Sequence, residues 1–198
     1  AWSLAITLAG LFAILLAAHK TQVVTKIIPF ESSKTQAQDS KQKRASIPKA
    51  AFIFLCLITL YGTVEAIIGN WTTVYLYSEK SLSFSQAGIA LSLFWAFLTL
   101  GRLITAGLTH KMDAVPIYRL SPLLMLIALI LIAKGSATSS IYWGYILVGL
   151  GSAAFFPLSI SLASRFHPKW EELLSSLSLT FIMIGIGLGS SFVGLLSE

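Results

Sequence analysis

Six apolar segments alternate with polar connections along this chain of 198 residues. A helix rises about 1.5 Å per residue, so about 20 apolar residues cross a hydrocarbon core of roughly 30 Å. The segments cover residues 1–19, 50–77, 84–108, 114–133, 141–163 and 173–196. This pattern predicts an all-α, polytopic membrane protein with six transmembrane helices. Residues 20–49 are rich in Lys, Gln and Ser, which predicts a flexible linker.

Composition supports this class, because hydrophobic residues make up 56% of the chain and charged residues only 11%. A soluble domain carries roughly 25% charged residues. The net charge of +6 indicates topology rather than a nucleic acid partner, since all 14 basic residues except Lys80 and Lys134 fall on one side of the predicted spans. The positive-inside rule then places the linker in the cytoplasm and both chain ends outside, in a plasma membrane or a bacterial inner membrane.

Glu65 is the acidic residue that cannot be assigned to a loop or a chain end. A carboxylate inside a span costs several kcal/mol unless it faces a cavity or a partner, so it is a functional candidate. Tyr61, Gly69 and Thr72 share its helix face at helical spacing. Such a face could bind a polyol by hydrogen bonds or carry a proton. The alternative is a structural hydrogen bond from Glu65 to a neighbouring helix.

Other candidates lie in the same predicted span and in two later spans. Gly69 and Asn70 favour a local break in the helix, unless Gly69 only makes room for a neighbouring helix. Trp95 could stack on a sugar ring, or serve for packing or lipid contact. Pro157 predicts a kink, either a hinge or a static bend. The predicted solute or proton pathway comprises Tyr61, Glu65, Asn70, Trp71, Thr72 and Trp95.

Four motifs follow one another in the chain: YGTVEAIIGNWTTVYL, GRLITAGLTHKMD, GYILVGLGSAAFFPLSISLASRF and GIGLGSSFVGLL. In this order they resemble helix seven, the approach to the loop between helices eight and nine, helix ten, and the end of helix eleven in the major facilitator superfamily. The resemblance is to the sugar-porter-like branches of these secondary transporters. It covers about residues 50–196 and implies a partial fold, with residues 1–19 as helix six and residues 50–198 as most of the carboxyl-terminal half.

The resemblance implies secondary active transport of a small polar solute, a sugar or related metabolite, by alternating access. Glu65 would be the carboxylate of a proton symporter or of the substrate site. The partners implied are the lipid bilayer, the solute and the missing amino-terminal half, expected on the same gene product or on another chain.

The second motif also implies a cytoplasmic gate formed by Arg102, His110, Lys111 and Asp113. The family pattern has Asp, Arg and Gly at the last three positions, so this chain departs from it. A simple cation whose side chain snorkels to the membrane interface is the alternative for Arg102.

The other residues favour packing over chemistry. The small residues Gly149, Gly151 and Ala153, and Gly185 with Gly189, predict close helix contacts. The histidines lie at no metal-ligand spacing, and with the single Cys56 they give no catalytic constellation, so we expect no enzyme activity, metal or cofactor. A second hypothesis is a membrane scaffold, or a receptor-like relative, that does not transport and binds a partner protein through the basic linker.

Overall fold

The computed structural model describes residues 49–196, which fold into five α-helices and one 3-10 turn without strands. The predicted first span, and the linker up to residue 48, lie outside the described residues. The all-α fold class is confirmed. The elements are α2 (Lys49–Ser78), α3 (Phe84–Thr109), α4 (Ala114–Lys134), α5 (Thr138–Phe166), η1 (Pro168–Trp170) and α6 (Glu171–Leu196).

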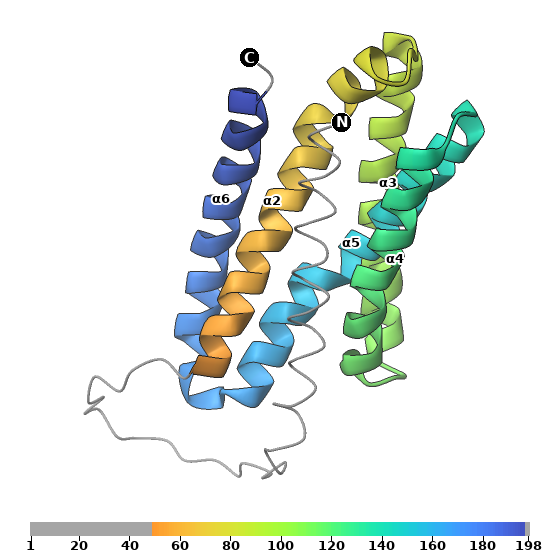
Figure 1. The fold of residues 1–198 in the computed structure, drawn as a ribbon. Helices are drawn as coiled ribbons and strands as arrows, with labels where there is room; N and C mark the ends of the chain where they lie inside the picture. Colours follow the sequence, from red (N-terminus) through yellow and green to blue (C-terminus); the bar gives the residue numbers. More distant parts are fainter. Residues whose placement is uncertain (1–48, 197–198) are drawn as a thin grey trace.

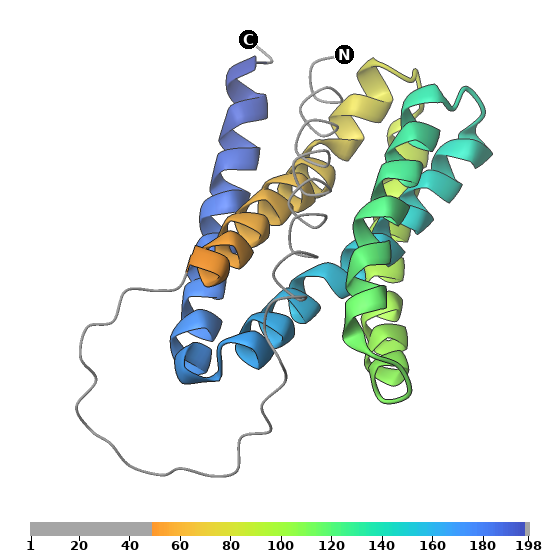
Figure 2. The same ribbon diagram turned by 60° about the horizontal axis from the view of Figure 1, so that its bottom comes forward.

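The helices form two groups that share α5 (Figures 1 and 2). On one side α2 lies along α6; on the other side α3 and α4 each pack against the first part of α5, which then passes toward α2 and α6. Successive helices run in opposite directions. One end of the bundle therefore holds the start of α2, the α3–α4 connection and η1, while the other end holds the α2–α3 and α4–α5 connections.

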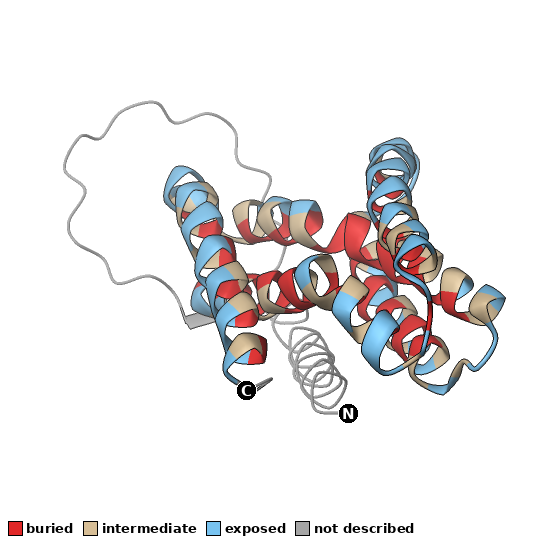
Figure 3. Cartoon of the chain, turned by 90° about the horizontal axis from the view of Figure 1, so that it is seen from above, coloured by how far each residue is buried: buried red, intermediate tan, exposed pale blue. Residues whose placement is uncertain are grey.

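Large apolar side chains cover the outside of this bundle, and buried positions face neighbouring helices (Figure 3). Leu103, Leu120 and Leu195 are 69%, 59% and 73% exposed, whereas soluble proteins rarely expose such large contiguous apolar areas. Five helices among the described residues are long and apolar enough to cross a membrane. The described part of the chain is therefore an integral membrane protein whose outer faces contact lipid.

Glycines bring α6 against the backbone of α2. A Cβ atom on Gly185 would overlap the carbonyl oxygen of Thr59, and a Cβ atom on Gly189 would lie 2.5 Å from the carbonyl oxygen of Thr63. Lipid provides no hydrophobic force between helices, so such close packing supplies much of the attraction. The predicted packing function of Gly185 and Gly189 is confirmed.

The first part of α5 packs in the same way between α3 and α4. A Cβ atom on Gly149 would lie 2.6 Å from the carbonyl oxygen of Phe94 in α3. On the other side, a Cβ atom on Gly151 would lie 2.8 Å from Cγ of Met125 in α4. Gly149 and Gly151, two residues apart on α5, therefore allow two different helices to approach closely. This agrees with the predicted close helix contacts.

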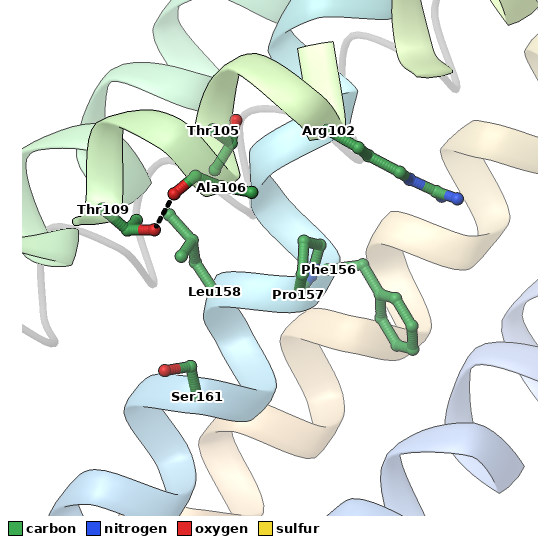
Figure 4. A pocket seen from close by; sticks show the side chains of 8 residues that line it. All are labelled: Arg102, Thr105, Ala106, Thr109, Phe156, Pro157, Leu158 and Ser161. Carbon is green, nitrogen blue, oxygen red and sulfur yellow. Dashed lines mark hydrogen bonds between the residues drawn. The ribbon is translucent and has the colours of Figure 1, made fainter. Parts of the chain in front are cut away.

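Two predictions about backbone irregularity have opposite outcomes. The helix α5 changes direction where Pro157 lies, as expected of a residue that lacks an N–H group (Figures 2 and 4). The predicted break at Gly69 and Asn70 is wrong, because α2 is continuous from Lys49 to Ser78. Gly69 instead makes room for Trp95, whose ring carbon Cζ2 would lie 3.0 Å from a Cβ atom there.

Lys80 links the α2–α3 connection to the α4–α5 connection at one end of the bundle. Its ammonium group donates hydrogen bonds to the carbonyl oxygens of Ala133 at 2.7 Å and Gly135 at 3.0 Å. These carbonyl groups close the end of α4, where helix hydrogen bonds are missing and a positive charge is favourable. Next to Lys80, Ser83 and Gln86 form a capping box that starts α3.

The contact between α2 and α6 predicts different effects for two neighbouring glycines. Gly185→Ala should destabilise the folded protein by about 1–3 kcal/mol, because its methyl group meets the backbone of α2. Gly187→Ala is the matched control, since nothing lies within 4 Å of the place that its methyl group would occupy. Thermal unfolding in detergent would measure both variants, and equal melting temperatures would contradict the packing assignment.

His167 connects α5 to η1, and burial lowers the pKa of its imidazole below the usual value. The unfolded chain then binds a proton more readily than the folded chain, so stability should fall as the pH drops through the unfolded-state pKa of about 6.5 toward the lower folded-state value. His167→Gln should remove this component from the melting temperature measured against pH. An unchanged profile in the variant would contradict it.

Candidate functional site

Three aromatic rings stack through the centre of the described bundle. Phe155 of α5 lies between Tyr61 of α2, at a centroid distance of 5.3 Å, and Tyr118 of α4, at 4.9 Å. Phe156 also stacks on Tyr61 at 6.4 Å. Tyr61 and Phe155 are fully buried and Tyr118 is nearly so, so the stack connects α2 to α4 through α5.

The hydroxyl group of Tyr61 donates a hydrogen bond to the carbonyl oxygen of Ser152 at 3.1 Å. Ser152 lies in the turn of α5 that precedes Pro157. Helices tolerate proline in membranes because groups on neighbouring helices satisfy the loosened backbone. Tyr61 bonds the carbonyl next to that of Ala153, the one that Pro157 leaves without a helix donor, and so links α2 to the bend of α5.

Glu65 lies one helical turn beyond Tyr61 and is half-buried. Its Oε2 atom is buried and has no hydrogen-bond partner among the described residues. Leaving a buried polar atom unpaired costs about 1–3 kcal/mol, and more for a charged group. The Glu65 carboxylate and the Arg102 guanidinium both lie close enough to the Tyr61 hydroxyl to act on it electrostatically. Tyr61, Glu65 and Arg102 therefore form the candidate functional site.

Arg102 and Trp95 reach α2 on either side of Glu65. Figure 4 shows Arg102 extending from α3 toward α2, on the side where Phe156 also points. Trp95, two turns earlier on α3, has its ring against Gly69 and remains 44% exposed. Because α2 and α3 are antiparallel, Arg102 lies by Tyr61 and Trp95 by Gly69, with Glu65 between these levels. The predicted pathway residues Tyr61, Glu65 and Trp95 thus share one region.

The other predicted pathway residues contact α6 or their own helix rather than Glu65. The Asn70 side chain donates to the hydroxyl of Ser190 in α6 at 2.8 Å. Trp71 packs near Gly194 of α6, and its buried Nε1 has no hydrogen-bond partner among the described residues. Thr72 is buried and donates to the carbonyl of Ile68 in its own helix. These three residues do not join the Glu65 cluster.

The four residues predicted for a gate are divided between two places. Arg102 lies with Glu65, while His110 ends α3 and is exposed with Lys111. Asp113 pairs instead with Arg165 at the end of α5, with 2.9 Å between Oδ1 and Nη1. Sequence reasoning missed this ion pair, because Arg165 entered only the count of basic residues. Both side chains are about half exposed, so the pair contributes at most about 1 kcal/mol.

A groove of about 410 Å³ runs between α3 and α5 beside the bend (Figure 4). It is lined by Arg102, Thr105, Ala106, Thr109, Phe156, Pro157, Leu158 and Ser161. The Thr109 hydroxyl donates to the Ala106 carbonyl at 3.0 Å, so it is engaged within α3. The groove leaves space next to the residues that form the bend of α5.

Comparison with known proteins relates the whole chain to one family. The sequence model of the Major Facilitator Superfamily matches residues 1–197. Major facilitator superfamily domain-containing protein 4A of Xenopus tropicalis is 28% identical over 152 residues, which cover 73% of this chain and 29% of that protein. The uncharacterized transporter y4wD of Sinorhizobium fredii is 26% identical over 154 residues, covering 77% and 41%.

A third relative has a named substrate. The glucose/mannose transporter GlcP of Bacillus subtilis is 24% identical over 143 residues, covering 72% of this chain and 35% of the transporter. The chain thus spans less than half the length of these curated relatives, and no solved structure matches it significantly. With the family model matching all but the last residue and the described part forming a bundle of apolar helices, the chain belongs to the major facilitator superfamily.

Proposed function

We propose that this chain is part of a secondary transporter that moves a small polar solute across the membrane by alternating access. Membership of the superfamily and the naming of relatives as transporters support this function over that of an enzyme. The alternative, a scaffold that binds a partner, rests on the altered gate motif at residues 110–113 and on the charge of the linker at residues 20–49, which lies almost wholly outside the described residues.

The observation that carries the proposal is the buried, unpaired Oε2 atom of Glu65. A carboxyl group in this position can take up a proton or accept a hydrogen bond from a hydroxyl group of the solute. We assign proton coupling to Glu65, because it is a carboxyl group inside the membrane-spanning helix α2 with a buried oxygen that lacks a partner among the described residues.

The residues around Glu65 fit a sugar or a related polyol. The exposed ring of Trp95 offers an apolar surface to the C–H groups of a sugar ring. The Glu65 carboxylate accepts hydrogen bonds from hydroxyl groups, and the Arg102 guanidinium donates them. The named substrate of the Bacillus subtilis relative supports the same class of solute.

We also propose that the end of the bundle with the α3–α4 connection and η1 lies in the cytoplasm. Lys111, Arg165 and Lys169 lie at that end, while Lys80 and Lys134 lie at the opposite end. Positive residues are enriched on the cytoplasmic side of membrane proteins.

Glu65→Gln in the full-length protein should abolish uptake driven by a pH gradient, because the amide cannot exchange a proton. Solute counterflow, which needs no net proton movement, should persist if the site otherwise binds. Uptake into proteoliposomes with and without a pH gradient would measure this, with Glu79→Gln in the α2–α3 connection as a control. Undiminished pH-driven uptake would remove Glu65 from the mechanism.

Trp95→Ala should raise the KM for a sugar solute by roughly tenfold, because a lost aromatic contact of about 1.4 kcal/mol corresponds to that factor. Trp143→Ala is the control, since Trp143 is exposed on α5 at 62% and lies away from Glu65. Concentration-dependent uptake at matched expression would give both KM values. Equal values for the two variants would place the solute away from Trp95.

A further inference from the structure

The hydroxyl group of Tyr61 has one hydrogen atom and two acceptors within its reach. It donates to the Ser152 carbonyl at 3.1 Å in this structure. The Glu65 carboxylate lies one helical turn further along α2, has a buried oxygen without a hydrogen-bond partner among the described residues, and is close enough to the same hydroxyl to act on it electrostatically. A phenol O–H can serve only one acceptor fully at a time. The two acceptors therefore compete for Tyr61.

The first acceptor, the Ser152 carbonyl, lies in the part of α5 where Pro157 removes a helix hydrogen bond. Pro157 has no N–H group for the carbonyl of Ala153, and its ring pushes that turn of the helix open. The Ser152 carbonyl lies in the same turn, so its bond to Tyr61 links the bend to α2. Losing this bond would leave a backbone group of a bent helix with fewer partners in an apolar surrounding.

The Tyr61 ring is fixed while its O–H bond is free to turn. Phe155 and Phe156 stack on the ring at 5.3 Å and 6.4 Å, and the side chain is fully buried. Rotation about the C–O bond changes the acceptor without moving the ring. The switch therefore needs no repacking of α2.

We propose that Tyr61 is a positioning residue that transmits the protonation state of Glu65 to the bend of α5. This inference rests on the proposed role of Glu65 as the proton carrier. With Glu65 protonated, Tyr61 donates to Ser152 and holds the bend. With Glu65 ionised, the stronger charge-assisted hydrogen bond draws the Tyr61 hydroxyl to the carboxylate, and the Ser152 carbonyl is released.

The charged groups around this switch are few in the described part of the chain. Arg102 of α3 acts on the Tyr61 hydroxyl together with Glu65. The helix α5 has no titratable side chain between Tyr145 and Arg165, and α6 has none after Glu172. Tyr118 of α4 is a further titratable group in the stack, where it lies on Phe155. The test below therefore separates Glu65 and Tyr61 from Tyr118.

The test measures the position of the α5 arm that follows Pro157 in the full-length protein. Spin labels on Met112→Cys, between α3 and α4, and on Lys169→Cys, in η1, occupy exposed positions on either side of the bend. Cys56 and other accessible cysteines are first replaced by Ser. Pulsed electron paramagnetic resonance gives the distance distribution between the labels at mildly acidic and at mildly alkaline pH, without solute.

In the unsubstituted background we expect the distribution to shift between the two pH values. Glu65→Gln should fix it in the acidic form, and Tyr61→Phe, which keeps the stacked ring, should remove the shift. Tyr118→Phe is the matched control, because it removes a buried hydroxyl from the same stack that lies 3.4 Å from Ser159 and does not reach Ser152 or Glu65. This control should retain the shift.

A full pH shift in Tyr61→Phe would overturn the switch, as would the absence of any shift in the unsubstituted background. Neither result would contradict the proposed transport function, provided that Glu65→Gln still abolishes pH-driven uptake. Conversely, undiminished pH-driven uptake by Glu65→Gln would overturn the role of Glu65 in transport and, with it, the premise of the switch. Uptake and label distance thus separate failure of the inference from failure of the proposed function.

Discussion

The described fold depends on how one bent helix, α5, packs between α3 and α4 and then reaches α2 and α6. The helix α5 packs through Gly149 and Gly151 against α3 and α4, and then turns at Pro157 toward α2 and α6. In lipid, every backbone group at such a turn needs a partner inside the protein. Tyr61 bonds the carbonyl of Ser152, next to the Ala153 carbonyl that lacks a helix donor because of Pro157, and the stacked rings of α5 contact the tyrosine. The bend and the candidate site are therefore parts of one contact.

Small residues and aromatic residues have complementary functions in this arrangement. Glycines on α5 and α6 remove side chains where two backbones meet, so the helices approach closely and gain dispersion contacts. These close backbone contacts restrict how far one helix can slide or rotate against its neighbour. The aromatic stack lies where α5 departs from α3 and approaches α2, and large rings fill the wider space there. The rigid parts of the bundle thus surround the one place where α5 bends.

The sequence could predict what a single helix determines. Apolar length predicted helices along the described chain, glycine spacing predicted close packing, and Pro157 predicted a bend. It could not predict how one helix is rotated and shifted against the next. The gate expected for Arg102 stays a prediction, and the sequence could not predict that this side chain extends from α3 toward Tyr61 of α2. The local sequence around Gly69 likewise fits a broken helix or a close contact, and only the position of Trp95 decides between them.

The placement of Glu65 and Arg102 puts two charged side chains close enough to the Tyr61 hydroxyl to act on it. Tyr61 can interact with either form of Glu65, but donating to the carboxylate withdraws its hydrogen from Ser152. In the proposed switch, the ionised state of Glu65 therefore costs the Ser152 carbonyl its bond to α2, while that carbonyl keeps its place in the hydrogen-bond ladder of α5. On this proposal, a proton at Glu65 changes the link between α2 and the bend of α5 even before any solute is bound.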